Sequence, residues 1–490
     1  MYSAEMSGHA DRNMRYNFFD FAGGAWNFID PANFMNSGVN AFTARSGFGN
    51  LDVDPVTGVA YISCHQADGP CVGRDVAPGA GLFGECPGAP AVTGLGPSMS
   101  LTSSERVHVA LTDDSLFQLC YSRIDPWCTW STPVPLVPPS PEPGFAGYIC
   151  RASKTSQKVL VTWVHDSLSG PAQGWYRQST NDGMTWDTAV QVPYPPAFTP
   201  GSETTASFYV AGFCPFLDHA DDLHIVAVIM PMIGGIGYAV PVGIWHWFQP
   251  TGIWSRIHRA SAETLAAGVG YNALYAGRPT LCEGDPGELV CIWEEFDSLN
   301  PEPTTSLLRA EIRAARSLDN GGTWGGAVTL TEPSTGSMRF PAVAPRMWGD
   351  TVWIRYELDE CAGFGIAPYA QGPITNNPII VQRFVPWWFS IAEDRTCDPR
   401  VLSCVALPNP FAGATTLCYE LPKSGCVRLS VSDAAGRTVR VLVDGVAQPG
   451  RHSVCWDGRG EHGMALRSGV YFCNLETGGK RLTRKVVLLP

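Results

Sequence analysis

Arginine and acidic side chains flank the apolar runs of this sequence in a pattern that could build a polar binding site. Arginine precedes several of these runs, and carboxylate or histidine side chains follow them. A guanidinium group pairs with a carboxylate through two parallel hydrogen bonds, and carboxylates accept hydrogen bonds from hydroxyl groups. Gathered in one place, these residue types would suit a carboxylated sugar. The candidate ligand-binding residues are Arg45, Arg151, Arg278, Arg339, His65, His165 and Glu295.

A second set of residues could carry glycoside hydrolysis. Such an enzyme needs two carboxyl groups roughly 5 to 9 Å apart with separated pKa values. Neighbouring acids of an extended chain point to opposite sides, so we expect only one of Glu294 and Glu295, or of Asp113 and Asp114, to face a site. The catalytic candidates are Tyr356, Glu357, Glu294 and Asp166.

A repeated eight-residue pattern indicates the elements that hold these residues. Ser317–Trp324 and Ser179–Trp186 match closely, and worn copies end at Trp130, Trp254 and Trp26. In this pattern Asp or Asn accepts backbone hydrogen bonds, glycine takes a positive φ, and tryptophan fills the apolar layer beneath. We therefore expect one kind of β-hairpin turn to recur along the chain.

The spacing of the turns predicts six repeat units. The five tryptophans lie 104, 56, 68 and 70 residues apart, so the first interval holds two units, and such a period is typical of a propeller. The last unit lacks the turn, whereas the first turn precedes the first unit. We expect the N-terminal segment to add outer strands to the sixth blade and so to close the ring. The apolar runs of the six units are residues 51–63, 107–112, 159–164, 223–230, 289–293 and 351–356.

In a propeller, the loops that enter each blade share one face with the loops between second and third strands. The four arginines named above would lie in entering loops, and the repeated turns would lie on the opposite face. A structural role is the alternative: the arginine of an Arg-x-Pro sequence would pair with an acid of the neighbouring blade, and the histidines would bond to nearby acids. The second-to-third loops would hold His65, Asp68, Asp113, Asp114, His165, Asp166, Glu294, Glu295, Asp297, Glu357, Asp359 and Glu360.

The repeated turn resembles the Asp-box, or BNR repeat, of sialidases and other propeller proteins. Ser317–Trp324 matches it fully and Ser179–Trp186 nearly so. The resemblance implies an arginine triad, an Asp acid/base and a Tyr activated by Glu. The sequence departs from the sialidase signature because its nearest match, Arg339-Phe-Pro341, opens the sixth unit instead of the first. The nearest equivalents are Arg278, Arg339 and Arg45 or Arg151, with Tyr356-Glu357, Tyr271 or Tyr275 as the phenol.

Residues 395–490 differ from the rest in composition. Six short alternating strands are expected at 415–421, 426–432, 438–443, 452–456, 470–475 and 484–489, which indicates a small β-sandwich. Asn409-Pro-Phe411, Tyr419-Glu-Leu-Pro422 and Trp456-Asp-Gly-Arg459 resemble the immunoglobulin-like domain related to the flagellar hook-capping protein, and the sorting tails of type IX secretion. That resemblance implies export or surface attachment through an export machinery. An ordinary spacer domain is the alternative.

Bulk composition narrows the cellular setting. Sixteen cysteines without a zinc pattern favour an oxidising compartment with disulfides, although free buried cysteines are the alternative. No apolar run is long enough for a membrane span, and no signal peptide can be read at the N-terminus. The net charge of −12 argues against nucleic acid as a partner. Loop carboxylates such as Asp359 and Glu360 could bind calcium, and no other cofactor is indicated.

Three functions fit these observations. The first is a secreted or cell-surface propeller that binds an extracellular glycan or surface polymer through its loop face. The second is an exo-glycosidase of the sialidase type, and the third is a structural subunit of a surface layer or appendage. The first leads because one propeller scaffold serves many functions.

Overall fold

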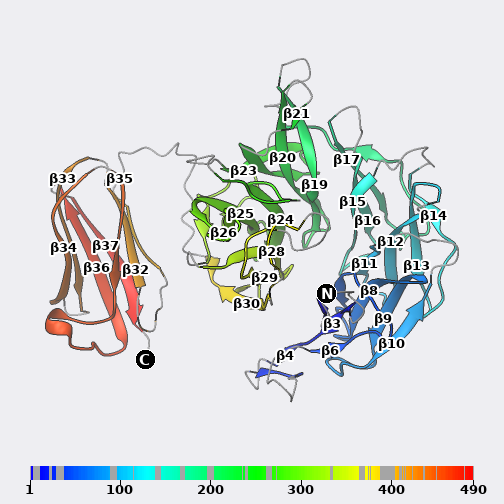
Figure 1. Ribbon diagram of the computed structural model, residues 1–490, viewed down its shortest axis with the longest axis horizontal. Coiled ribbons are helices and arrows are strands. Elements are labelled where there is room, and N and C mark those ends of the chain that lie inside the picture. Colours follow the sequence, from blue (N-terminus) through cyan, green and yellow to red (C-terminus); the bar gives the residue numbers. More distant parts are fainter. Residues whose placement is uncertain are drawn as a thin grey trace. The chain divides into compact units, whose positions relative to one another are not determined.

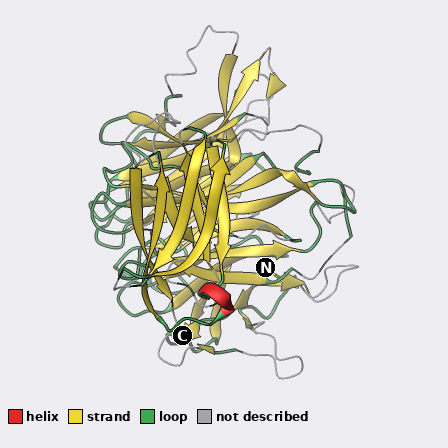
Figure 2. Cartoon of the chain, turned by 90° about the vertical axis from the view of Figure 1, so that its left-hand side faces the viewer, coloured by secondary structure: helices red, strands yellow, loops and turns green. Residues whose placement is uncertain are grey.

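The computed structural model divides the chain into two compact units, Met1–Asp394 and Arg395–Pro490. Both consist almost entirely of β-strands, as Figure 2 shows. The structure describes residues 2–3, 12–20, 25–28, 38–88, 96–113, 115–137, 145–165, 171–195, 204–233, 236–237, 241–260, 267–271, 273–331, 335–363, 370–373, 375, 377–386, 403–407, 411, 413, 415–421, 423–433, 436–448, 450–478 and 480–488.

The first unit is a β-propeller with six consecutive antiparallel sheets (Figure 1). The first strands of successive sheets contact one another, so the first strand of each sheet is the innermost. In chain order the sheets are β7 (Leu51–Val53), β8 (Ala60–Gln66), β9 (Gly69–Asp75) and β10 (Phe83–Pro87); β11 (Ser98–Leu101), β12 (Val107–Asp113), β13 (Gln118–Ile124) and β14 (Val134–Pro135); β15 (Phe145–Ala152), β16 (Val159–His165), β17 (Gln173–Ser179) and β18 (Val190–Gln191); β19 (Thr204–Leu217), β20 (Leu223–Ile233), β22 (Val242–Phe248) and β23 (Ile253–Ala260), with β21 (Ile236–Gly237) beside β20; β24 (Ala276–Glu283), β25 (Leu289–Pro301), β26 (Leu308–Ser317) and β27 (Val328–Thr329); and β28 (Ser337–Val343), β29 (Val352–Asp359) and β30 (Ile379–Phe384).

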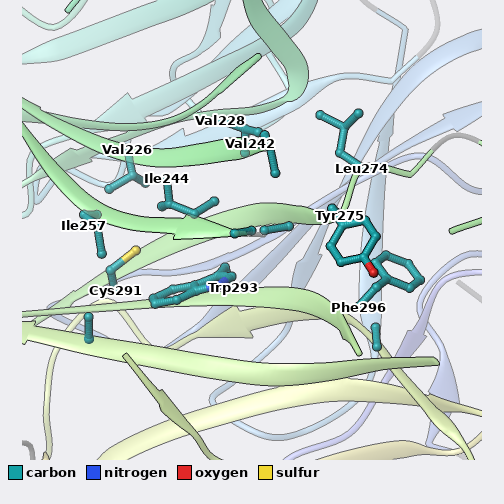
Figure 3. Packing of buried hydrophobic residues seen from close by; sticks show 14 of the residues in the cluster. Val226, Val228, Val242, Ile244, Ile257, Leu274, Tyr275, Cys291, Trp293 and Phe296 are labelled. Carbon is teal, nitrogen blue, oxygen red and sulfur yellow. The ribbon is translucent and has the colours of Figure 1, made fainter. Parts of the chain in front are cut away.

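Apolar clusters join each sheet to the next. The six expected apolar runs all contribute a second strand. Five of these strands are buried on both sides and read as nearly continuous apolar runs, whereas β29 of the sixth sheet alternates between buried and partly exposed residues. Figure 3 shows the cluster between the fourth and fifth sheets, where Ile244, Cys291 and Trp293 are fully buried. Four further clusters link sheets one and two, two and three, three and four, and five and six.

The repeated tryptophans fill these layers. Trp130, Trp186, Trp254 and Trp324 each pack into the cluster between their own sheet and the preceding one. Trp130, Trp186 and Trp324 belong to connections between a third and a fourth strand, and Trp254 is the second residue of the fourth strand β23. The expectation that these residues fill the apolar layer beneath a turn is confirmed.

The N-terminal segment does not take the place expected of it. Among the described residues, its short strands pair with one another, and β30 remains the outer strand of a three-stranded sixth sheet. Tyr16 and Phe42 instead cover Ala60 and Ile62 of the first sheet. Because side chains alternate along β8, Tyr61 faces the second sheet while Ala60 and Ile62 need another cover. The aromatic side chains of the N-terminal segment supply it.

The second unit is an immunoglobulin-like sandwich of two sheets. Its core contains Phe411, Leu417, Trp456 and Tyr471, and the Trp456 indole donates a hydrogen bond to the Arg459 carbonyl at 3.0 Å. All six expected strands are present, and one further strand, β31, precedes them. The sheets are β31 (Ser403–Leu407), β32 (Thr415–Leu421) and β35 (Gly450–Trp456), and β34 (Thr438–Ala447), β33 (Gly425–Ser432), β36 (Gly469–Thr477) and β37 (Lys480–Leu488), with a short helical turn at Glu461–Gly463.

One disulfide joins Cys86 to Cys128, with their Cα atoms 5.1 Å apart. It links β10 of the first sheet to the turn after β13 of the second. Eleven further cysteines whose side chains the structure describes form none, and most of these are buried. Both sequence-based readings of the cysteines therefore hold, each for part of them. Within the described ranges, no helix is long and apolar enough to cross a membrane.

Candidate functional site

A backbone irregularity recurs on the innermost strands of the propeller. A residue with positive φ lies two positions before the point where regular pairing with the second strand begins or resumes. In four sheets this residue lies in a bulge at the end of the strand that the chain enters first, and in the second sheet it precedes the start of β11. Five sheets share it, at Phe48 (φ 54°), Gly96 (φ 72°), Gly147 (φ 58°), Arg278 (φ 52°) and Phe340 (φ 53°).

The residue type at this position varies although the backbone does not. Glycine tolerates positive φ, whereas a bulky residue is strained there. Phe48 and Phe340 are nevertheless 53% and 39% exposed. Such strain persists only where the surroundings enforce it, and it concentrates at functional sites. The bulges therefore mark the inner rim of this face as the candidate site.

Candidate residues of the sequence lie directly opposite these bulges. In four of the five sheets the residue before the positive-φ position pairs with the second strand, as Gly47 does with His65 and Gly277 with Glu294. Arg339 pairs in the same way with Glu357. His65, Glu294 and Glu357 thus occupy equivalent positions in three blades.

Arg278, Arg339 and Glu294 form one cluster between the fifth and sixth sheets. The Glu294 carboxylate is fully buried and lies 2.5 Å from Nη1 of Arg278 and 3.2 Å from Nε of Arg339. It also accepts a hydrogen bond from the backbone N–H of Phe340 at 2.9 Å. Both guanidinium groups stack on the Phe340 ring, with centroid distances of 4.6 and 5.0 Å. Two cations therefore share one carboxylate at the bulge.

The charges of this cluster act on each other and on a nearby phenol. Burial alone would raise the pKa of Glu294, but Arg339, Arg278 and the Phe340 N–H hold it below its usual value. Tyr209 of β19 lies within range of all three charged groups. Its pKa is raised, chiefly by burial and also by Glu294, against the lowering effect of the two arginines. At neutral pH the carboxylate is ionised and the phenol is protonated.

Glu295 points away from this cluster. Its carboxylate accepts hydrogen bonds from the Trp293 indole at 2.8 Å and pairs with His258 at 3.0 Å and Arg313 at 3.5 Å. Burial would raise its pKa, but His258 and Arg313 lower it. The expectation that Glu294 and Glu295 face opposite sides is confirmed. So is the structural alternative for Arg339, which pairs with an acid of the neighbouring blade.

The other two arginines do not join the pair. Arg45 lies exposed in the loop before β7, as expected for an entering loop. Arg151 lies instead within β15, close to its far end, where it pairs with Leu160 at the start of β16. Nη1 of Arg151 donates a hydrogen bond to the carbonyl of the preceding residue, Cys150, at 3.1 Å. The entering loop of this blade lies before β15, and the apolar run around Cys150 belongs to the strand itself.

The two histidines lie at the ends of second strands but at different positions. His65 faces a bulge, and its Nδ1 is buried without a hydrogen-bond partner in the described part of the chain. His165 is displaced by one residue, since Val164 occupies the place opposite Ala146 and His165 pairs with Phe145. Because side chains alternate, the two histidines face opposite sides of their strands.

The phenol predicted for catalysis lies in the core. Tyr356 is 7% exposed and packs in the cluster between the fifth and sixth sheets, and its hydroxyl bonds to Gln382 at 3.2 Å. Tyr275 is buried in the cluster of Figure 3, and Tyr271 is 48% exposed in a loop. Glu357 accepts a hydrogen bond from Asn377 at 3.0 Å. Alternation along β29 directs Tyr356 and Glu357 apart, so they do not form a nucleophile pair. Asp166 and Asp114 lie outside the described residues.

The remaining acids serve turns. Asp113 accepts hydrogen bonds from the Ser115 and Leu116 backbone, which lowers its pKa together with the Ser115 hydroxyl. Asp68 is exposed in the β8–β9 turn. Burial raises the pKa of Asp359, which accepts from the Cys361 N–H at 3.3 Å. Among the described side chains, no group of three or more His, Cys, Asp or Glu could hold a metal ion.

Three residues of the rim escape sequence reasoning. Tyr209, Phe48 and Phe340 are aromatic, and aromatic residues are ordinary in strands. The one available signal is the residue pair Phe340-Pro341, because its alignment with Arg278-Pro279 marks equivalent strand starts. Nothing comparable marks Phe48.

Comparison with known proteins bears mainly on the second unit. Residues 412–479 match the FlgD Ig-like domain. This agrees with the sandwich topology and the expected hook-capping relationship. A search of curated protein sequences finds no significant match for the chain.

Several solved structures described as polysaccharide lyases or glycosidases match the chain at low similarity. A polysaccharide lyase described as PL25-Ulvanlyase has 10% identity and a TM-score of 0.43, covering 91% of this chain and 95% of its own. Polysaccharide lyase Uly1 has 9% identity and a TM-score of 0.45, covering 76% and 85%. A xylan beta-1,4-xylosidase from Bacillus Halodurans has 9% identity and a TM-score of 0.31, covering 81% and 90%. Similarity at this level carries no inference about activity.

Proposed function

We propose that this protein is a secreted or cell-surface propeller that binds an acidic extracellular glycan at the inner rim of its loop face. The arrangement of Arg278, Arg339 and Glu294 carries the proposal. Two guanidinium groups contact one buried carboxylate, which balances the charge of one of them, and the Arg278 side chain keeps 16% of its surface exposed. A sugar carboxylate is a natural partner for such a group.

Arg339 would then act as a positioning residue. It is 7% exposed, and with Glu294 it fixes the plane in which the Arg278 guanidinium lies on Phe340. A preorganised group loses less entropy on binding than a mobile surface arginine. Delivery of the chain to the cell exterior by the FlgD-like unit, as a type IX sorting domain or a surface attachment, belongs to the same proposal. The disulfide between Cys86 and Cys128 supports an oxidising destination.

The test measures binding of the protein to immobilised acidic hexasaccharides. These are prepared from polygalacturonate, polymannuronate, chondroitin and polysialic acid, and each is compared with its carboxyl-reduced form. We expect an acidic glycan to bind, its reduced form to bind at least tenfold more weakly, and Arg278→Ala to abolish the difference. Arg256→Ala is the control, since Arg256 is an exposed arginine of β23 that also contacts an aromatic ring, that of Trp245. Equal binding by Arg278→Ala and wild type would refute the proposal.

The position of Tyr209 favours one second candidate, a carbohydrate-active enzyme. A protonated phenol next to two guanidinium groups could give a proton to a leaving sugar oxygen. Release of a fluorophore from aryl glycosides, including a sialoside, tests this. Activity that is lost in Tyr209→Phe with unchanged glycan binding would support the enzyme, and no turnover on any substrate would leave the binding function alone.

A further inference from the structure

Phe48 occupies the same strained position in the first blade that Arg278 occupies in the fifth. Its φ is 54° and the residue is 53% exposed. A bulky side chain at positive φ costs about 1 kcal/mol or more. A residue that keeps 53% of its surface exposed recovers only part of that cost through packing.

The backbone around Phe48 is held on both sides. Gly47 exchanges two backbone hydrogen bonds with His65, at 3.1 and 2.7 Å. Asn50 does the same through its side-chain amide with the backbone of Met99, at 2.7 and 2.8 Å. Gly49 lies so close to the second strand that a Cβ atom there would come within 1.6 Å of the Ser63 carbonyl oxygen. The ring is therefore presented by a rigid support.

The neighbouring rim positions leave room beside this ring. The second and third blades carry glycine there, Gly96 and Gly147. Tyr148 donates a hydrogen bond to the Gly96 carbonyl at 2.9 Å, and a Cβ atom on Gly96 would lie 4.0 Å from the Cβ of Phe48. An exposed aromatic ring, two positions without side chains and a fixed phenol thus follow one another along the rim.

We propose that Phe48 is the stacking platform of a second sugar subsite, which takes a pyranose ring of the same glycan whose acidic sugar Arg278 binds. The C–H face of a pyranose packs on an aromatic ring, while polar groups at the edge fix its orientation. This inference rests on the proposed function and adds to it that the ligand is an oligosaccharide that contacts several blades.

The decisive variant is Phe48→Gly, because glycine removes the ring and suits the positive φ. Titration calorimetry would compare the best-binding of the acidic hexasaccharides with its disaccharide. We expect Phe48→Gly to bind the hexasaccharide about tenfold more weakly than wild type and the disaccharide equally well, with a melting temperature that is unchanged or higher. Glu105→Gly is the matched control: Glu105 also has positive φ (60°), but in the exposed turn between β11 and β12, at the opposite end of the blade from the rim. It should leave both affinities unchanged.

The outcomes separate the two proposals. Unchanged hexasaccharide affinity in Phe48→Gly, or a lower melting temperature with loss of both ligands, overturns the platform. A wild type that binds no acidic glycan, or an Arg278→Ala variant that binds like wild type, overturns the proposed function instead.

Discussion

The two faces of the propeller repeat in different ways. The hairpin turns Ser179–Trp186 and Ser317–Trp324 repeat in sequence, whereas the inner-strand bulges repeat only in backbone conformation. In the turns, Ser317 and Asp319 make the structure: Asp319 Oδ1 accepts from the Ser317 hydroxyl at 2.7 Å and the Thr323 N–H at 2.8 Å. Asn181 does the same for the Thr185 N–H at 2.9 Å. Residue types there cannot vary freely.

The bulges require only a positive φ at one residue, and neighbouring hydrogen bonds enforce that conformation. Phenylalanine, glycine and arginine all occur at the same position. The difference teaches that the turn face is fixed by side-chain chemistry, while the rim face leaves its side chains available for a ligand. Substitutions in the turns should therefore change stability, and substitutions at the bulges should change binding.

Glu294 is the exception at the rim and should show the largest effect. Glu294→Gln leaves two guanidinium groups without their buried carboxylate, for which we expect a loss of about 3 to 5 kcal/mol in the free energy of unfolding. Urea unfolding measures it. Glu357→Gln is the matched control, since Glu357 occupies the equivalent place in the sixth blade and is only partly buried. It should cost less than about 1 kcal/mol. Equal losses in both variants would mean that the Glu294 cluster has no special role.

The sequence allowed the turn face to be predicted and the rim face only in part. Spaced tryptophans and the Ser-x-Asp pattern indicated six units, because those residues build the turns. Arg278 and Arg339 were both predicted to bind a ligand from entering loops, in the sequences Arg278-Pro279 and Arg339-Phe-Pro341. Arg151 was misplaced because its strand begins at Phe145, six residues earlier. Tyr356 was assigned to the site although β29 alternates: Tyr356 lies on the apolar side with Val352 and Ile354, whereas Arg355 and Glu357 lie on the other side.

The N-terminal segment shows a second limit. Its strands could be expected from the missing turn of the sixth unit, but their partner depends on which sheet face is left uncovered. That face is formed by Ala60 and Ile62, which read in the sequence like any other core positions. Contacts between distant segments of this kind carry no local signal.

The pH dependence of stability should come partly from a buried histidine beneath one of the repeated turns. His108 is fully buried beneath Ser179–Trp186, bonded to the Tyr121 hydroxyl at 2.6 Å and 3.7 Å from Asp182. Burial, helped by Arg123 and Arg106, lowers its pKa from 6.5 to about 3. The unfolded chain therefore binds a proton at a pH where the folded chain does not. Titration of His108 therefore lowers the free energy of unfolding as the pH drops from above 6.5 toward 3. The loss is about 2 kcal/mol between pH 6.5 and 5.

His108→Gln tests this contribution, because glutamine does not titrate. The variant will be less stable at pH 7, but its free energy of unfolding should fall less steeply on acidification. We expect the difference between wild type and variant to shrink by about 2 kcal/mol between pH 6.5 and 5 in urea titrations. If the free energy of unfolding changed with pH in parallel for the two proteins, the fold would not hold His108 neutral.

The smallest effect should come from Asp319, and it addresses the comparison of the two faces directly. Asp319→Ala removes three acceptor contacts, to the Ser317 hydroxyl, the Thr323 N–H and the Thr323 hydroxyl. The turn is partly exposed, so we expect a loss of about 1 to 2 kcal/mol in the free energy of unfolding. Asp319→Asn should lose less than about 0.5 kcal/mol, since Asn181 fills this role in the sister turn and its amide donates to the Thr185 hydroxyl at 2.9 Å. Affinity for the acidic hexasaccharide should stay within twofold in both variants. A larger change in affinity at unchanged stability would mean that the turn face also contacts the ligand.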